Sequence, residues 1–114
     1  MKEHPVQQRV MLLSRGATRL WRNNCGMLQD RFGKWVRFGV ANPGGSDLIG
    51  FHSVIITPDM VGKKVAIFTA FEVKRSSGGK ATDKQLRFID LVKCFGGIAG
   101  VVRSEEEAKS LLTE

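Results

Sequence analysis

Residues 65–74 constrain this chain most, because nearly every side chain from Val65 to Phe71 is apolar or β-branched. The run is too short to cross a bilayer, which takes about 20 apolar residues. It is also too uniformly apolar for a strand with one face in water, so it predicts a strand buried on both faces. We therefore expect residues 64–74 to lie at the centre of a sheet.

Two charged residues, Glu72 and Lys74, end this apolar run. Residues two apart on a strand point to the same face. The carboxylate and the ammonium group are thus expected side by side where the strand reaches the surface. An ordinary surface ion pair is one interpretation of this pattern, and part of an active site is the other.

The length of 114 residues indicates one domain, residues 1–114, with a core of its own. The net charge is +7, and it is unevenly distributed. Residues 1–50 hold eight basic and three acidic side chains (+5), whereas residues 51–114 hold ten and eight (+2). Such a balance favours a polyanionic partner, nucleic acid before an anionic membrane.

The two cysteines, Cys25 and Cys94, are far apart and lack the spacing of a zinc site or a disulfide framework. Pro5 and the polar residues that follow it interrupt the N-terminus, so no signal peptide is predicted. No apolar run is long enough for a membrane span. We expect a cytoplasmic protein of a bacterium or a phage-infected host cell, with no membrane partner.

Hydrophobic periodicity and turn residues predict an α/β fold, with a central mixed β-sheet flanked by helices. A parallel crossover should join residues 64–74 to residues 98–102. The expected elements are a helix over 4–23, a hairpin of 27–28 and 34–38, strands over 47–51, 53–57, 64–74 and 98–102, and helices starting at 82 and 104.

Two aspartates compete as partners of Glu72. Asp59 lies in the loop between the expected strands 53–57 and 64–74, roughly 26 Å from Glu72 at about 3.3 Å per residue. This places Asp59 in an ordinary turn. The same antiparallel register brings Gly50 beside Glu72, with Asp47 just before it on a flexible glycine-rich loop. Asp47 is therefore the preferred partner.

A cluster of Asp47, Glu72 and Lys74 predicts a site for hard Mg²⁺ or Mn²⁺, because two adjacent carboxylates repel unless a cation lies between them. Such an ion makes a bound water more acidic and stabilises charge on a phosphate oxygen. Lys74 would orient the attacking water or offset charge in the transition state. This combination suits the hydrolysis of a phosphodiester.

These motifs resemble those of the VRR-NUC domain, the virus-type replication-repair branch of the PD-(D/E)XK nuclease superfamily. The resemblance spans essentially the whole chain, and Ser46 departs from the proline that the family often has. It implies a restriction-endonuclease-like core, with Asp47, Glu72 and the carbonyl of Val73 as metal ligands and Lys74 as a catalytic residue. The motifs are Gly44-Gly45-Ser46-Asp47-Leu48-Ile49-Gly50, Phe71-Glu72-Val73-Lys74, Gln85, Phe95-Gly96-Gly97 and Val101-Val102-Arg103-Ser104.

Two further residues have alternative roles. Gln85 matches a family glutamine near the catalytic site, but it also stands three residues after Thr82 in the arrangement of a capping box. Glu3 is similar to a helix glutamate that reaches the metal in the family, while a chain-end position is its plain alternative.

Basic side chains at this edge are expected to bind DNA phosphates, although each one singly is also compatible with a solvated surface charge. Trp21 and Trp35 are expected in the core, with stacking on bases as the alternative. The basic candidates are Arg75, Lys80, Lys84, Arg22 and Arg37.

The sequence therefore predicts a Mg²⁺- or Mn²⁺-dependent endonuclease acting on branched DNA. Resolving a four-way junction takes two matched cuts, and this requirement favours a symmetric homodimer. Stand-alone relatives in the VRR-NUC family are regarded as Holliday-junction resolvases. The alternative is a non-catalytic DNA-binding module with a vestigial acidic site.

Overall fold

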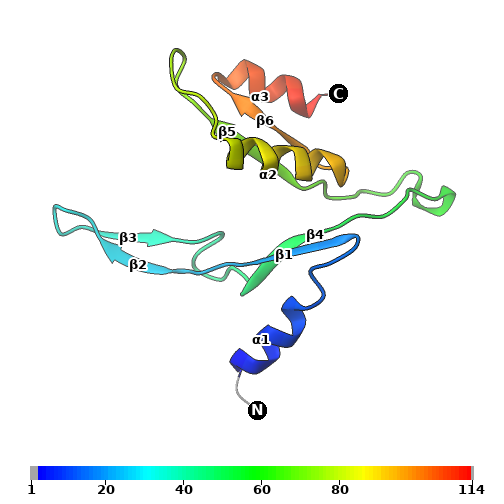
Figure 1. Ribbon diagram of the computed structural model, residues 1–114, viewed down its shortest axis with the longest axis horizontal. Helices are drawn as coiled ribbons and strands as arrows, with labels where there is room; N and C mark the ends of the chain where they lie inside the picture. Colours follow the sequence, from blue (N-terminus) through cyan, green and yellow to red (C-terminus); the bar gives the residue numbers. More distant parts are fainter. Residues whose placement is uncertain (1–2, 114) are drawn as a thin grey trace. The chain divides into compact units, whose positions relative to one another are not determined.

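The computed structural model describes residues 3–113, and the side chains of residues 5–113. It is a mixed α/β structure whose chain divides after His52 into two compact units (Figure 1). The first unit contains α1 (Glu3–Met11), β1 (Thr18–Arg22), β2 (Gly26–Gln29), β3 (Trp35–Phe38) and β4 (Leu48–His52). The second contains the 3₁₀ turn η1 (Pro58–Met60), β5 (Thr69–Val73), α2 (Asp83–Cys94), β6 (Ile98–Val102) and α3 (Glu105–Leu112).

The predicted helix over residues 4–23 is wrong in its second half. After α1, Gly16 has a φ of 59° and turns the chain into β1. The hydroxyl of Ser14 accepts a hydrogen bond from the backbone N–H of Leu20 at 2.9 Å, which fixes this turn. The spacing of Ala17 and Leu20 fits a helix, and it is pairing with β4 that makes residues 18–22 a strand.

Two antiparallel pairs make up the sheets of the first unit, β1 with β4 and β2 with β3. Gly50 is required in β4, because a Cβ there would lie 1.8 Å from the carbonyl oxygen of Arg19. Across this pair, the rings of Trp21 and Phe51 meet edge to face with centroids 5.5 Å apart. The predicted hairpin is confirmed as β2–β3, and its turn residue Gly33 has a φ of 82°.

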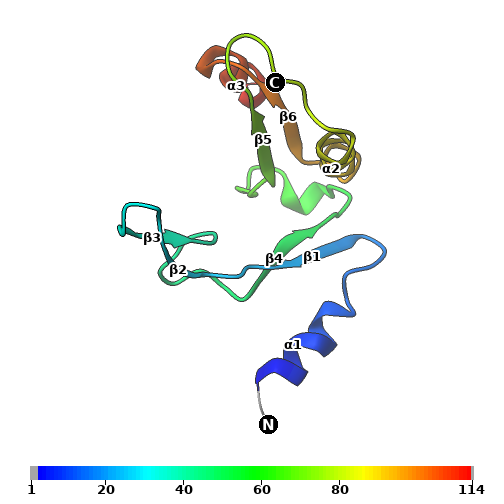
Figure 2. The ribbon, with the colours of Figure 1, turned by 60° about the vertical axis from the view of Figure 1, so that its left-hand side comes forward.

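In the second unit, β5 and β6 pair in parallel and are joined through α2, as predicted. Figures 1 and 2 both show the two strands side by side. α2 packs on one face of this pair, and Leu111 of α3 lies over Gly100 on the other face. The buried apolar side chains gather here, namely Ile89, Val92, Ala99 and Val102.

The ends of α2 follow the local sequence closely. The hydroxyl of Thr82 accepts from the N–H of Gln85 at 3.1 Å, and the Gln85 side chain accepts from the N–H of Thr82 at 2.9 Å, a complete capping box. Gly96, at a φ of 95°, ends the helix. At α3, Ser104 caps Glu107, whose carboxylate accepts from the N–H of Arg103. Within residues 3–113, no helix is both long and apolar enough to cross a membrane.

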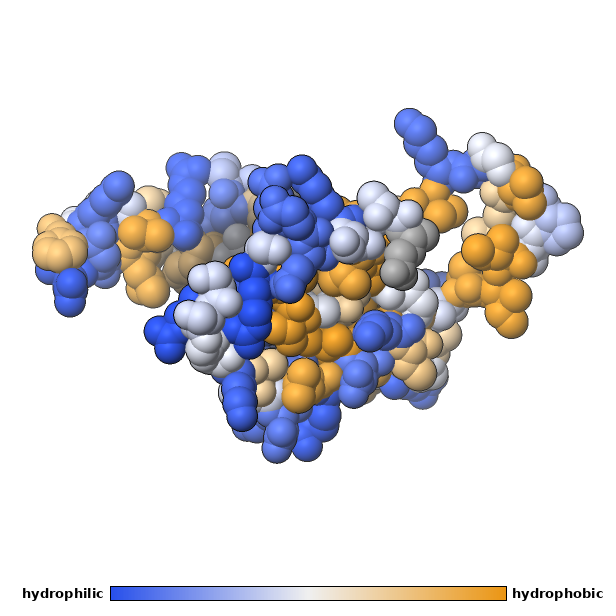
Figure 3. All heavy atoms as spheres, turned by 90° about the horizontal axis from the view of Figure 1, so that it is seen from above, coloured by the Kyte–Doolittle hydropathy of each residue, from blue (hydrophilic) through white to orange (hydrophobic). Residues whose placement is uncertain are grey.

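The expected strands over residues 53–57 and 64–68 do not form. Only residues 69–73 of the long apolar run are paired, and the side chains of Ile55 and Val65 are 89% and 57% exposed. Figure 3 shows hydrophobic side chains of this segment at the surface. An apolar composition indicates only that a segment can be buried. To form a strand, the segment also needs a neighbouring strand whose backbone N–H and C=O groups are available for pairing. The partner of β4 is β1, so Gly50 faces Leu20, and the single central sheet is not confirmed.

Candidate active site

β5 presents the carboxylate of Glu72 and the ammonium group of Lys74 on one face, as their spacing predicted. Lys74 Nζ lies 3.4 Å from Glu72 Oε2. The side chain of Lys74 is 20% exposed and that of Glu72 is 31% exposed, so solvent reaches both groups. The backbone N–H of Lys74 donates to the carbonyl of Val102 at 2.9 Å, which anchors the end of β5 on β6. The pair therefore lies on a fixed strand end.

The backbone of Val73 supplies an oxygen at the same strand end. The C=O of one residue and the N–H of the next belong to one planar trans peptide group and point in opposite directions. Because the N–H of Lys74 faces β6, the carbonyl of Val73 points away from β6, toward the outer edge of the two-stranded sheet. A carboxylate and a carbonyl are the oxygen donors that Mg²⁺ and Mn²⁺ prefer, so the donor chemistry here fits such an ion.

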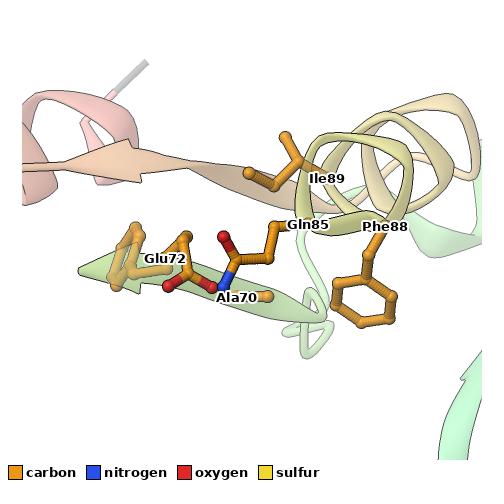
Figure 4. A pocket seen from close by; sticks show the side chains of 6 residues that line it. Ala70, Glu72, Gln85, Phe88 and Ile89 are labelled. Atoms are coloured by element: carbon orange, nitrogen blue, oxygen red, sulfur yellow. The ribbon is translucent and has the colours of Figure 1, made fainter. Parts of the chain in front are cut away.

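The structure gives Gln85 both of the positions expected from the sequence. Its carbonyl oxygen belongs to the capping box of α2. Its side chain also lines a cavity of about 210 Å³ between α2 and β5. In Figure 4 the Gln85 side chain extends from α2 toward β5, on the side of the Glu72 carboxylate. Capping therefore holds the amide in place beside Glu72 rather than competing with that position.

The rest of this cavity is mostly apolar. Phe88 and Ile89 contribute from α2, and Ala70 and Phe71 from β5, so the polar groups of Glu72 and Gln85 are grouped together against an apolar wall (Figure 4). A single water needs only about 10–15 Å³ of such volume. The cavity has room for several water molecules next to the carboxylate.

Asp47 lies in the first unit, directly before β4, and its side chain is exposed. Its carbonyl accepts from the N–H of Asn23 at 2.8 Å. The Asn23 side chain also donates to the carbonyls of Val40 and Ser46 at 2.9 and 3.1 Å. This asparagine, to which the sequence analysis gave no role, fixes both ends of the loop that carries Asp47.

The remaining candidates occupy different places. Asp59 sits in η1 and accepts a hydrogen bond from the hydroxyl of Thr57, which confirms it as a turn residue. The side chain of Glu3 lies outside the described residues. Arg22 ends β1 and Arg37 belongs to β3, both exposed in the first unit. Over the side chains that the structure describes, no three His, Cys, Asp or Glu residues are grouped closely enough to hold a metal.

No model of a known protein family matches this chain, and neither curated proteins nor solved structures contain a match. The comparisons therefore give no support to the resemblance to the VRR-NUC domain, which stays a prediction from the sequence motifs.

The basic loop over residues 75–80 follows Lys74 directly and is fixed by Arg103, a residue to which sequence reasoning gave no structural role. Arg103 Nη1 donates to the carbonyls of Arg75 and Gly78 at 2.9 and 2.7 Å, and Nη2 donates to Gly79 at 2.7 Å. Gly78 and Gly79 both have positive φ, which curves their carbonyls toward this guanidinium. The loop thereby holds exposed Arg75 and Lys80 next to the site, and Lys84 lies in the first turn of α2.

Replacing Arg103 by lysine is expected to loosen this loop without changing the net charge. A lysine cannot reproduce the planar fork that reaches several carbonyls, and each lost charged hydrogen bond costs about 1.5–3 kcal/mol at most. We expect faster amide exchange over residues 75–80 and faster trypsin cleavage at Arg75 and Lys80.

Arg87→Lys is the matched control. Arg87 is exposed on α2, so this substitution makes the same chemical change at a position outside the loop. Equal exchange rates in wild type, Arg103→Lys and Arg87→Lys would show that the three carbonyl contacts do not order the loop.

Proposed function

We propose that this chain is a Mg²⁺- or Mn²⁺-dependent endonuclease that hydrolyses phosphodiester bonds in branched DNA. The observation that carries the proposal is the Glu72–Lys74 pair at the end of β5, 3.4 Å apart, with Gln85 on the neighbouring wall. An acidic group and an amine held together beside a basic loop are suited to a phosphate substrate. The proposal includes a restriction-endonuclease-like core, which the VRR-NUC motifs imply.

Glu72 and the Val73 carbonyl would hold the divalent cation, which supplies positive charge to the phosphate and makes a coordinated water more acidic. The VRR-NUC motifs imply Asp47 as the further ligand. The chain's own groups do the rest. Lys74 donates hydrogen bonds to the attacking water or to a non-bridging phosphate oxygen, where negative charge increases in the transition state. In the reaction, the attacking water gives up a proton to solvent and its oxygen forms a bond to phosphorus. The bond from phosphorus to the leaving sugar oxygen breaks, and that oxygen takes a proton from solvent.

The basic loop would bind phosphates on either side of the bond that is cut. Arg75 and Lys80 are exposed in the loop that follows Lys74, and Lys84 adds a third exposed positive charge in the first turn of α2. Contacts of this kind fix the position of the backbone and carry no sequence information. The substrate would then be chosen by DNA shape, as expected for an enzyme of branched DNA.

A homodimer completes the proposal, because a chain with one active site makes one cut and a four-way junction needs two symmetric cuts. Light scattering of the purified chain measures this directly. A mass of twice 12.6 kDa supports paired cutting. A mass of one chain, with and without junction DNA, rejects it.

The test is cleavage of labelled four-way junctions, flaps, forks and plain duplexes by the purified chain with Mg²⁺, Mn²⁺ or EDTA. We expect cuts in branched substrates only when a metal is present, and a loss of at least about 100-fold in Asp47→Ala.

Asp59→Ala is the matched control, since it removes the competing aspartate, and it should cleave at the wild-type rate. Wild-type cleavage by Asp47→Ala would remove that residue from the site. Binding of junctions without cleavage under any metal condition would indicate a non-catalytic DNA-binding module instead.

A further inference from the structure

The β2–β3 hairpin has two chemically different faces. In its antiparallel register, Met27 lies opposite Arg37 and Gln29 opposite Trp35, whereas Leu28 lies opposite Val36. Side chains alternate along a strand, so Gln29, Trp35 and Arg37 share one face, and Leu28, Val36 and Phe38 share the other. The first face combines an aromatic ring with a cation.

The tip of the hairpin carries a net positive charge, because Arg31 and Lys34 outnumber its one acidic side chain, Asp30. Asp30 Oδ1 accepts from the backbone N–H groups of Phe32 and Lys34 at 2.8 and 2.9 Å. This arrangement turns the carboxylate toward the loop backbone. Arg31 and Lys34 remain at the surface, and the Arg31 guanidinium lies 4.9 Å from the ring centre of Phe32.

The two tryptophans of the chain have different surroundings. Trp21 is half-buried and packs against Phe51. Trp35 is 60% exposed, so the expectation that it lies in the core is wrong, and Phe32 is 82% exposed. Figure 3 shows hydrophilic and hydrophobic side chains next to one another on the hairpin, at the left-hand end of the view. Exposed aromatic rings among Arg and Lys side chains suit a polyanion that also offers flat apolar surfaces.

We infer that the β2–β3 hairpin is a nucleic-acid-binding arm that engages unpaired nucleotides, with Trp35 stacking on a base while Arg37 and Lys34 contact phosphates. This rests on the proposed DNA substrate, but it requires no catalysis. Stacking is available only where a base is unpaired, so the arm would distinguish the single-stranded part of a flap or fork from plain duplex. The exposed ring of Trp35 favours this occupant over an acidic protein surface, because every unpaired base presents a flat face on which the ring can stack.

The experiment uses the Trp21→Phe chain, in which Trp35 is the one remaining tryptophan. Its fluorescence is titrated in EDTA with three probes, namely oligo(dT), a flap with a single-stranded arm, and a blunt duplex of equal length. We expect quenching by oligo(dT) and by the flap, and little change with duplex. In the otherwise wild-type chain, Trp35→Ala should weaken flap binding by roughly 10- to 100-fold.

The two charged contacts are tested by salt dependence. Replacing Lys34 and Arg37 together by glutamine should lower the slope of log binding constant against log salt by about 1.4, at about 0.7 per single-stranded phosphate contact. The charge-matched control replaces two exposed lysines of the second unit, Lys63 and Lys93, by glutamine. It should leave the slope of log binding constant against log salt unchanged.

The outcomes separate this inference from the proposed enzyme. Quenching without cleavage in Mg²⁺ or Mn²⁺ would support the arm and reject the nuclease. Flap binding with unchanged Trp35 fluorescence and unchanged affinity in Trp35→Ala would reject the arm and leave the nuclease standing. A dimer that becomes a monomer in Leu28→Asp, with no quenching, would identify the hairpin as a surface between two copies and also reject the arm.

Discussion

Replacing Lys74 by methionine is expected to lower the rate of branched-DNA cleavage by about 10²–10³-fold. Methionine keeps most of the length of the side chain, so packing at the end of β5 should change little, while the positive charge 3.4 Å from Glu72 is lost. That charge would act on the attacking water or on a phosphate oxygen whose negative charge grows in the transition state. The loss should therefore appear in the rate constant of the cleavage step, measured under single-turnover conditions with saturating enzyme.

Lys109→Met is the matched control. Lys109 also forms an ion pair with a glutamate, Glu105, at 2.8 Å, but on the exposed surface of α3. Exposed pairs of this kind contribute little to stability, and this one has no place in the proposed site. Lys109→Met should cleave as fast as wild type. If Lys74→Met also retains the wild-type rate, the Glu72–Lys74 pair is an ordinary surface ion pair and the catalytic assignment fails.

The sequence predicted the α2–β6–α3 part of the chain best, for a physical reason. α2 and α3 begin at side-chain caps and α2 ends at Gly96, and these signals are local because they involve neighbours in the chain. β6 lies between them and was bounded by the same signals. β1 has no such signal, since its apolar residues Leu20 and Trp21 are adjacent and do not alternate with polar ones, and only its partner β4 makes it a strand.

The candidate site shows the same division. The proximity of Glu72 and Lys74 follows from a period of two, and Gln85 from the capping box, so both were accessible to sequence reasoning. Arg103 and Asn23 were not, because their targets are backbone carbonyls, which every residue possesses. Nothing in the order of side chains indicates which carbonyl a guanidinium or an amide will meet. The placement of Asp47 relied on a register between strands that do not pair with each other.

Replacing Gly97 by alanine is expected to destabilise the second unit by about 3 kcal/mol, at the upper end for overpacking. A Cβ at this position would lie 2.6 Å from Val92 Cγ1 and 2.8 Å from the carbonyl oxygen of Phe68. Neither atom can move freely, because Val92 is fully buried and the Phe68 carbonyl accepts from the N–H of Ile98 at 2.9 Å, at the start of the β5–β6 pairing. Urea unfolding followed by circular dichroism should show a lower midpoint with an unchanged m value.

Gly100→Ala is the control that separates a rigid clash from a soft one. A Cβ at Gly100 would come within 2.9 Å of Leu111 Cδ1, the far end of a flexible side chain on α3. A rotamer change can relieve that contact at a cost of about 0.5–1.5 kcal/mol. Gly97→Ala should therefore be clearly the less stable of the two. Shortening Val92 to alanine in the Gly97→Ala chain should recover only part of the lost stability, because the clash with the Phe68 carbonyl persists. Equal stability of the two glycine variants would mean that the junction between α2 and β6 is more loosely packed than these distances state.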